Sequence, residues 1–183
     1  MEMMPIIEKG ESMQTVPVET GGSLDDEESF TRWVAATQKS LIRFCRQFVG
    51  NWHDAEDIAQ EAYIRAWRKR GGFRGESSKL TWLMAIARRA SLDFLRRNNK
   101  PDALPLDEHD SATENNINTI LDVQMALKRL TADDRMILYL RIGEDMPFND
   151  IAKVLGRTVS TCRKRFERAK GKFSTEYYGE EKR

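Results

Sequence analysis

The chain has 183 residues and a formal net charge of +1, and its residues are 40% hydrophobic, 9% aromatic and 32% charged. This length permits one ordinary domain or two small ones and excludes two large enzymatic lobes. The apolar share excludes a wholly disordered chain, and no stretch approaches the ~18 apolar residues that a membrane span needs.

The first predicted elements are a tail and two helices. Residues 1–22 show no helical periodicity, so we expect a mobile N-terminal tail. Ser23 and Asp26 have the spacing of a capping box, and a long run of apolar residues at helical intervals follows them. Asp54 is expected to cap a second helix that ends near Arg70.

A third helix is predicted over Leu80–Arg97, after a Gly-rich loop with the sequence FRGESS. The three helices are expected to pack as one domain over residues 23–98. Residues 99–113 contain two prolines and several carboxylates with little apolar content, which is typical of a linker.

Residues 114–175 predict a second helical domain, and a C-terminal tail is expected at residues 176–183. Thr131 and Asp134 have the spacing of a second capping box, and Gly143 is expected to end the helix that follows. No alternation typical of strands occurs. The predicted fold class is therefore all-α, with two small helical domains joined by a flexible acidic linker.

The helices expected over residues 148–155 and 159–173 have the arrangement of a helix-turn-helix, with Gly156 at the turn. Apolar residues of both helices would face inward. Polar side chains on the outward face of the second helix could then bond to base edges in a major groove. These are Ser160, Arg163, Lys164, Glu167 and Arg168. The alternative is a basic helix that is only solvated.

Charge is segregated along the chain although the net charge is close to zero. Two basic blocks, residues 65–100 and 153–172, flank an acidic stretch at residues 102–122. In the first block, Phe73 and Trp82 bracket a polar loop. This arrangement suits unstacked bases, because rings stack on bases while cations hold phosphates. The alternative is that Trp82 belongs to the core and the arginines are solvated.

The second predicted helix has a polar face opposite Ile58 and Ala62, and this face could bind a basic partner. Its members are Asp54, Glu56, Asp57, Gln60 and Glu61. No His, nucleophile or phosphate-binding loop accompanies these carboxylates. Cys45 and Cys162 lack the spacing of a zinc site and are expected to be buried thiols. We therefore expect no enzymatic activity, no metal and no cofactor.

Three segments together resemble the extracytoplasmic-function (ECF) sigma factors, which are minimal members of the bacterial sigma-70 family. The segments are DAEDIAQEAYIRAW, FRGESSKLTWLMAIARRASLDFLRR and LKRLTADDRMILYLRIGEDMPFNDIAKVLGRTVSTCRKRFERAK. The resemblance covers about residues 25–173 and rests on the order and spacing of the segments. It implies a factor that binds the RNA polymerase core and directs promoter-specific transcription initiation. A signal-peptide pattern is absent from the N-terminus, so a cytoplasmic protein is expected.

The resemblance implies two roles for the first domain, region 2 of the family. The acidic helix would bind the clamp of the largest polymerase subunit through Asp54, Glu56, Asp57, Gln60 and Glu61. The loop and the helix after it would melt the minus-ten element, capture a flipped base and lie near the strand backbone. The residues at these positions are Phe73, Arg74, Ser77, Ser78, Thr81, Trp82, Arg88 and Arg89.

The second domain, region 4, would bind the minus-thirty-five element as duplex DNA and contact the flap of the second-largest subunit. The base-facing candidates are Arg163, Lys164, Glu167 and Arg168. The candidates for phosphate contacts and helix entry are Arg157, Thr158, Ser160, Thr161 and Arg165. Glu167 is an unusual acid for such a surface, and we hypothesise that it accepts a hydrogen bond from a cytosine amine. An anti-sigma protein is a further partner that the family implies.

Two other functions stay open. A dimeric helix-turn-helix regulator would bind duplex operators without being a polymerase subunit, although this leaves the first domain unexplained. An adaptor with sigma-like segments would bind polymerase without opening promoters.

Overall fold

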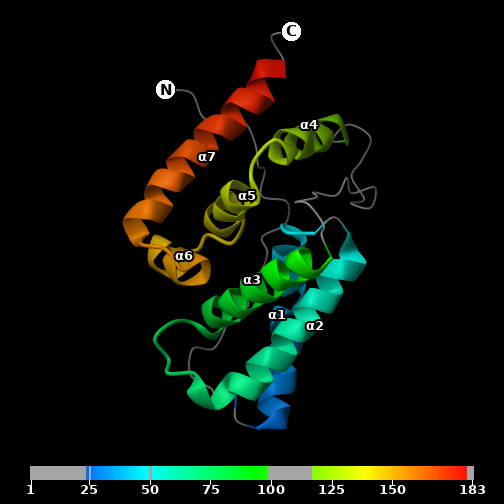
Figure 1. Cartoon of the computed structure of the whole chain (residues 1–183), viewed down its shortest axis with the longest axis vertical. Helices are drawn as coiled ribbons and strands as arrows, with labels where there is room; N and C mark the ends of the chain where they lie inside the picture. Colours follow the sequence, from blue (N-terminus) through cyan, green and yellow to red (C-terminus); the bar gives the residue numbers. More distant parts are fainter. Residues whose placement is uncertain (1–23, 25, 50, 99–116, 181–183) are drawn as a thin grey trace.

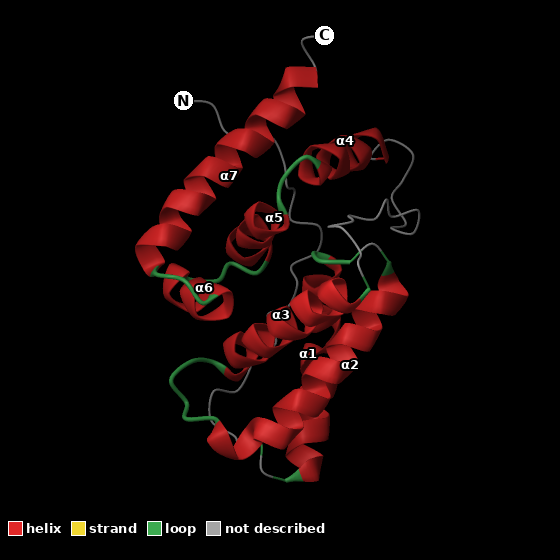
Figure 2. Ribbon diagram, in the orientation of Figure 1, coloured by secondary structure: helices red, strands yellow, loops and turns green. Residues whose placement is uncertain are grey.

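The computed structural model describes Leu24 and residues 26–49, 51–98 and 117–180, with only the backbone described for residues 117–121 and 180. All regular elements in these residues are helical (Figure 2). The prediction of an all-α fold is confirmed. The N-terminal tail and the linker at residues 99–113 lie outside the described residues.

The first domain is a three-helix unit. Its elements are α1 (Glu27–Arg46), α2 (Trp52–Lys69), a 3₁₀ turn (Arg70–Gly72) and α3 (Lys79–Arg97). The three α-helices pack against one another around a core that includes Leu41, Phe44, Ile58 and Leu83. The apolar periodicity of the sequence therefore predicts the correct number of helices for this part of the chain.

Two helix starts differ from the predictions. The cap of α1 is Asp26, whose Oδ1 accepts a hydrogen bond from the Ser29 N–H at 2.8 Å, so α1 begins after the position that the predicted capping box implies. The cap of α2 is Asn51 and not Asp54, because Asn51 Oδ1 accepts from the Asp54 N–H at 2.7 Å. Asp54 instead lies in the first turn, where a carboxylate is favoured by the helix dipole.

The second domain has four α-helices and one π-helical turn. Its elements are α4 (Ile117–Lys128), α5 (Ala132–Leu138), the turn η3 (Tyr139–Gly143), α6 (Phe148–Leu155) and α7 (Val159–Glu180). The longest helix, α7, packs on the other three α-helices of this domain. Thr131 caps α5 as predicted, with its Oγ1 accepting from the Asp134 N–H at 3.3 Å.

Helix α7 is longer than predicted, since it passes the expected end at Phe173 and enters the expected C-terminal tail. The Phe173 and Tyr177 rings, one helical turn apart, stack with centroids 5.7 Å apart. Arg129 of α4 donates to Glu176 of α7 at 2.8 Å. Side-chain contacts beyond Phe173 thus stabilise turns that the polar sequence alone does not predict.

The two domains pack against each other, with α6 lying across α3 (Figure 1). One hydrophobic cluster runs through both domains, and the Phe44 and Tyr139 rings meet with centroids 6.5 Å apart. Arg88 of α3 lies 3.7 Å from the Asp133 carboxylate of α5. This interdomain contact joins residues far apart in the chain, and no local pattern in the sequence predicts it.

Candidate functional site

The acidic face of α2 is formed as the sequence predicts. Glu56, Asp57 and Gln60 are exposed, while Ile58 and Ala62 on the opposite side are buried. The other two members of the face, Asp54 and Glu61, are half-buried. The face therefore offers carboxylates to a basic partner.

One residue of this face has an apolar side chain, so the polar pattern of the helix does not identify it. Ile64 is 46% exposed and lies one helical turn from Gln60 and Glu61. Beside it, Arg65 donates to Glu61 at 2.7 Å and to Asp93 of α3 at 3.0 Å. Single exposed apolar side chains are common on protein surfaces, so Ile64 adds apolar area to the acidic face without by itself marking a contact.

The start of α3 uses part of the predicted minus-ten set for its own cap. Ser78 Oγ accepts from the Thr81 N–H at 3.0 Å, and the two hydroxyls lie 2.8 Å apart. Thr81 is buried, so its side chain holds the helix start and is not presented at the surface. Ser77 is half-buried and Arg74 is exposed on the preceding loop.

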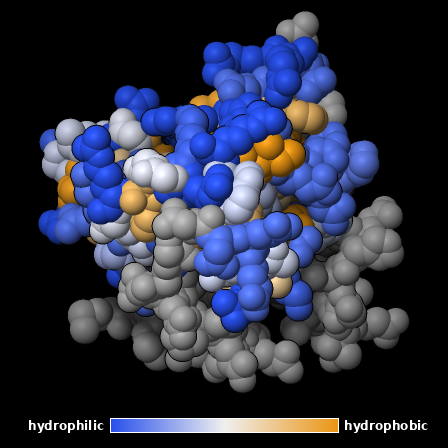
Figure 3. Space-filling view, turned by 90° about the horizontal axis from the view of Figure 1, so that it is seen from below, coloured by the Kyte–Doolittle hydropathy of each residue, from blue (hydrophilic) through white to orange (hydrophobic). Residues whose placement is uncertain are grey.

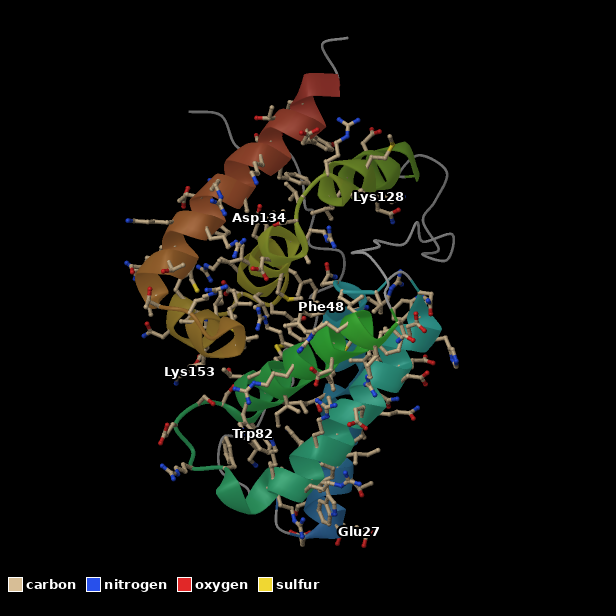
Figure 4. The ribbon with its side chains drawn as sticks, viewed as in Figure 1. Glu27, Phe48, Trp82, Lys128, Asp134 and Lys153 are labelled. Carbon is tan, nitrogen blue, oxygen red and sulfur yellow. The ribbon has the colours of Figure 1, made fainter. Side chains whose placement is uncertain are left out.

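The Phe73 and Trp82 rings contact each other, with centroids 5.2 Å apart and planes inclined by 48°. Both are half-buried, and Trp82, labelled in Figure 4, packs at the margin of the core. Trp82 therefore packs against the core, as the alternative interpretation expects, and stays partly accessible. Its contact with unstacked bases stays a prediction. A loop with a partly exposed aromatic pair can offer a face for base stacking.

The arginines of α3 differ in their surroundings. Arg89 is exposed, whereas the Arg88 side chain is only 17% exposed and faces Asp133 of the other domain. In this arrangement Arg88 takes part in domain packing. Its predicted contact with a DNA strand therefore requires the domains to separate.

The helix-turn-helix consists of α6, the turn at Gly156 and α7. Gly156 has φ +62°. The N–H groups of Gly156 and Arg157 bond to carbonyl oxygens at the end of α6. A helix C-cap of this kind favours glycine. Thr158 Oγ1 accepts from the Thr161 N–H at 3.2 Å at the start of α7. Cys162 and Ala169 are buried. The predicted outward side chains are all exposed, namely Ser160, Arg163, Lys164, Glu167 and Arg168.

Arg165 is the main departure from the predicted DNA-contact set. It donates to Asp133 at 2.7 Å and to Asp134 at 3.0 Å, so its guanidinium is directed into the domain. Lys172 also donates to Asp134, at 3.0 Å. Figure 4 shows Asp134 between α5 and α7. Arg165 therefore fixes the recognition helix on α5 and is a structural residue in this arrangement.

Asp134 is buried at the centre of these cations. Burial acts to raise the pKa of its carboxyl, but the hydrogen bonds from Arg165 and Lys172 hold that pKa at about 2, below the ordinary 3.8. Local patterns identified Asp134 only as a capping residue. Its partners Arg165 and Lys172 lie 31 and 38 residues further along the chain, so no short-range signal predicts their contact.

The described residues do not form a cluster of His, Cys, Asp or Glu suited to a metal ion. Both cysteines are buried as predicted, and burial raises the pKa of the Cys45 thiol to about 12. Among the helices of the described ranges, none is both long and apolar enough to cross a membrane. Figure 3 shows a mostly hydrophilic face with small apolar patches.

The unit of α6, the turn at Gly156 and α7 with an exposed outward face has the geometry of a DNA-binding helix-turn-helix. The family model for Sigma-70 region 2 matches residues 33–100, and the model for Sigma-70 region 4 matches residues 120–173. The two matches fall in order on the two domains. The chain belongs to the sigma-70 family, within the ECF sigma factors.

Two curated relatives span most of the chain. The chain is 29% identical over 162 residues to the RNA polymerase sigma-H factor of Pseudomonas aeruginosa, covering 79% of this chain and 84% of that protein. It is 26% identical over 164 residues to the ECF RNA polymerase sigma factor SigW of Bacillus subtilis, covering 79% and 87%.

Two solved structures share the fold. One is the sigma factor RpoE in complex with the anti-sigma factor NepR from Bartonella quintana, with a TM-score of 0.69 and 20% identity, covering 81% of this chain and 96% of that chain. The other is CnrH in complex with the cytosolic domain of CnrY, with a TM-score of 0.64 and 22% identity, covering 84% and 90%.

Proposed function

We propose that this sigma factor binds the core of bacterial RNA polymerase in the cytoplasm, recognises the minus-thirty-five element as duplex and melts the minus-ten element. The observation that carries the proposal is the pair of sigma-70 regions in order on one chain, each with the exposed polar surface that its role requires. A dimeric operator-binding regulator would use the second domain alone.

In region 2, we assign the polymerase contact to the acidic face of α2, centred on Glu56, Asp57 and Gln60, with Ile64 as its apolar member. Promoter melting is assigned to the loop and the start of α3, where Arg74 is exposed and Phe73 packs on Trp82. An extruded base that stacks on an aromatic ring offsets part of the cost of unpairing. Melting by base capture needs no nucleotide hydrolysis, so we propose no enzymatic activity.

In region 4, we assign base contacts to the exposed side chains of α7 near its start. Arg163 and Lys164 can donate to guanine, and Glu167 can accept from cytosine. Arg157, Thr158, Ser160 and Thr161 are exposed at the helix entry, which suits phosphate contacts. Contact with the flap of the second-largest subunit is proposed for the same domain.

An anti-sigma protein is a further proposed partner. Two proteins that share this fold support the proposal: RpoE was solved in complex with the anti-sigma factor NepR, and CnrH was solved in complex with the cytosolic domain of CnrY. The packed domains here leave the acidic face of α2 open, with Glu56 and Gln60 exposed. A protein that covers this face would block the proposed polymerase contact.

The test is run-off transcription with core polymerase from the same organism on a library of genomic promoter fragments, with and without the protein. We expect transcripts downstream of a shared two-part motif only when the protein is present. A variant with Arg163→Ala and Lys164→Ala should lose these transcripts, whereas Lys39→Ala, an exposed residue of α1, should keep them. Symmetric footprints on duplex DNA without polymerase, and no stimulation of transcription, would support the dimeric regulator instead.

A further inference from the structure

A cavity of about 270 Å³ lies between the two domains, where α3 faces the end of α6. Two cations from α3 and two from the end of α6 and the turn after it line the cavity, together with small and apolar residues. The cations are Arg88, Arg89, Lys153 and Arg157. No carboxylate of the described residues is part of the lining. Figure 4 shows Lys153 on the side of α6 that faces α3 and the loop before it.

The charges of these four residues are poorly compensated. Neither Arg89 nor Arg157 has a side-chain hydrogen bond or ion pair within the described part of the chain. The Arg88 Nε is buried and has no hydrogen-bond partner among the described residues. In the same part of the chain, the carboxylate that lies near Arg88 is that of Asp133, which is 3.7 Å away and already accepts from Arg165 at 2.7 Å.

Lys153 has partners but keeps its charge at the cavity. Its ammonium donates to the backbone oxygen of Glu76 and lies 3.5 Å from the Asp150 carboxylate. The negative end of the α6 dipole would oppose an anion. This effect is reduced because the N–H groups of Gly156 and Arg157 bond to the carbonyl oxygens of Lys153 and Ala152, at 3.4 and 3.0 Å.

An anion would remove two unfavourable features of this cavity. Like charges that converge on one space repel one another. A buried donor without a hydrogen-bond partner destabilises the folded state. Guanidinium groups match the oxygen geometry of phosphates and bind them through paired hydrogen bonds.

We propose that the interdomain cavity binds a small multivalent phosphate anion, of the size of pyrophosphate or tripolyphosphate, held by Arg88 and Arg89 from region 2 and by Lys153 and Arg157 from region 4. The volume is slightly below the range of about 300–1,000 Å³ for drug-sized ligands, so a short anion fits and a DNA duplex does not. Since the site exists only when the domains are packed, binding stabilises the packed arrangement. The inference does not depend on promoter recognition.

The test is calorimetric titration of the full chain with sodium tripolyphosphate at low ionic strength. We expect one site per chain. The variants Arg89→Gln and Arg157→Gln, one in each domain and both at exposed positions, should each weaken binding at least tenfold. Arg32→Gln makes the same charge change at an exposed position of α1 away from the cavity and should change the affinity less than twofold. Loss in only one of the two domain variants, or an equal loss in Arg32→Gln, would refute the proposal.

Two further measurements test which ligand binds and whether both domains form the site. A short single-stranded oligonucleotide of equal charge should bind at least tenfold more weakly than tripolyphosphate, and equal binding would identify an ordinary nucleic-acid contact surface. Hydrogen exchange should slow in α3 and in the turn after α6 together when tripolyphosphate is added. Slowing confined to one domain would contradict a site that both domains form.

Discussion

At the scale of single residues, Asp134 carries the charge network that fixes α7 on α5. Burial acts to raise the pKa of its carboxyl, yet Arg165 and Lys172 hold that pKa at about 2. Because the folded pKa lies below the unfolded value of 3.8, the carboxylate adds stability that is complete above about pH 4 and is lost as the pH falls toward 2. The contribution is on the order of 2 kcal/mol.

Replacing Asp134 by asparagine keeps the shape and removes the charge. We expect Asp134→Asn to lower the free energy of unfolding at pH 7 by roughly 2–3 kcal/mol, below the 3–5 kcal/mol of a fully buried pair because Arg165 and Lys172 reach solvent. Urea denaturation at several pH values measures this. The variant should also lose the pH dependence between about pH 4 and 2 that this group causes.

The control is Asp145→Asn, whose side chain is 91% exposed and which should change stability by less than ~0.5 kcal/mol. Equal stability of the Asp134 variant and the wild type would contradict the prediction.

Glu167 is the residue on which promoter choice is expected to depend most specifically. It is exposed among cations on the recognition helix, where a carboxylate costs affinity for phosphates unless it accepts a hydrogen bond from a base. We expect Glu167→Ala to lose about 1–3 kcal/mol of discrimination at one position of the minus-thirty-five element. Transcription from a set of promoters that carry each of the four bases at each position of this element measures the discrimination. Unchanged discrimination at all positions would exclude the cytosine contact.

At the scale of elements, two glycines of region 4 allow a matched test of the helix-turn-helix. A side chain at Gly156 or Gly171 would meet no atom within 4 Å, but only Gly156 has a positive φ, +62°. We therefore expect Gly156→Ala to destabilise the protein by ~1 kcal/mol and Gly171→Ala, inside α7, to stabilise it by ~0.5–1 kcal/mol. Thermal unfolding of both variants tests the pair. Effects of the same sign would contradict the conformation assigned to the turn.

The helices of the fold could be predicted because each buries one face, and a buried face leaves apolar residues at helical spacing in the sequence. Their starts could not all be predicted, because several capping residues stand close together. Asn51 and Asp54 can each cap a helix, and the structure uses Asn51, whose amide also donates to Asp54 Oδ2 at 2.8 Å. Local propensity does not choose between two such residues.

The sites were predictable where exposure follows from the helical pattern, as for the outward face of α7. They were not predictable where residues distant in sequence meet. Arg165 binds carboxylates of α5, and Arg88 faces Asp133 across the domain boundary. Such pairs depend on tertiary packing, so a basic residue that looks available for DNA in the sequence is engaged in the folded chain.

At the scale of the whole molecule, the packed arrangement conflicts with binding both promoter elements at once. Elements named for positions ten and thirty-five lie about 25 base pairs apart, or about 85 Å at 3.4 Å per base pair. A compact chain of this length is only roughly 40 Å across. The two domains must therefore separate before both elements are bound, and the contacts of Phe44 with Tyr139 and of Arg88 with Asp133 must break.

Fluorescence resonance energy transfer between one label on each domain can follow the separation of the two domains. Fluorophores on Lys39→Cys of α1 and Lys170→Cys of α7 would occupy exposed positions, and the native Cys45 and Cys162 are buried and so protected from labelling. We expect efficient transfer in the free protein and a large decrease when core polymerase and promoter DNA are added together. A second pair within region 2, Lys39→Cys and Lys69→Cys, should show no change.

The same experiment distinguishes which partner opens the molecule. Phe44 is fully buried, so separation exposes apolar surface next to Tyr139 at a free-energy cost that scales with the exposed area. Only a partner that covers this surface, or that binds the separated domains more tightly, can shift the equilibrium. We therefore expect core polymerase alone to lower the transfer and duplex promoter alone to leave it high. Opening by DNA without polymerase would mean that the interdomain contacts are weaker than their burial indicates, and that promoter binding does not wait for the polymerase.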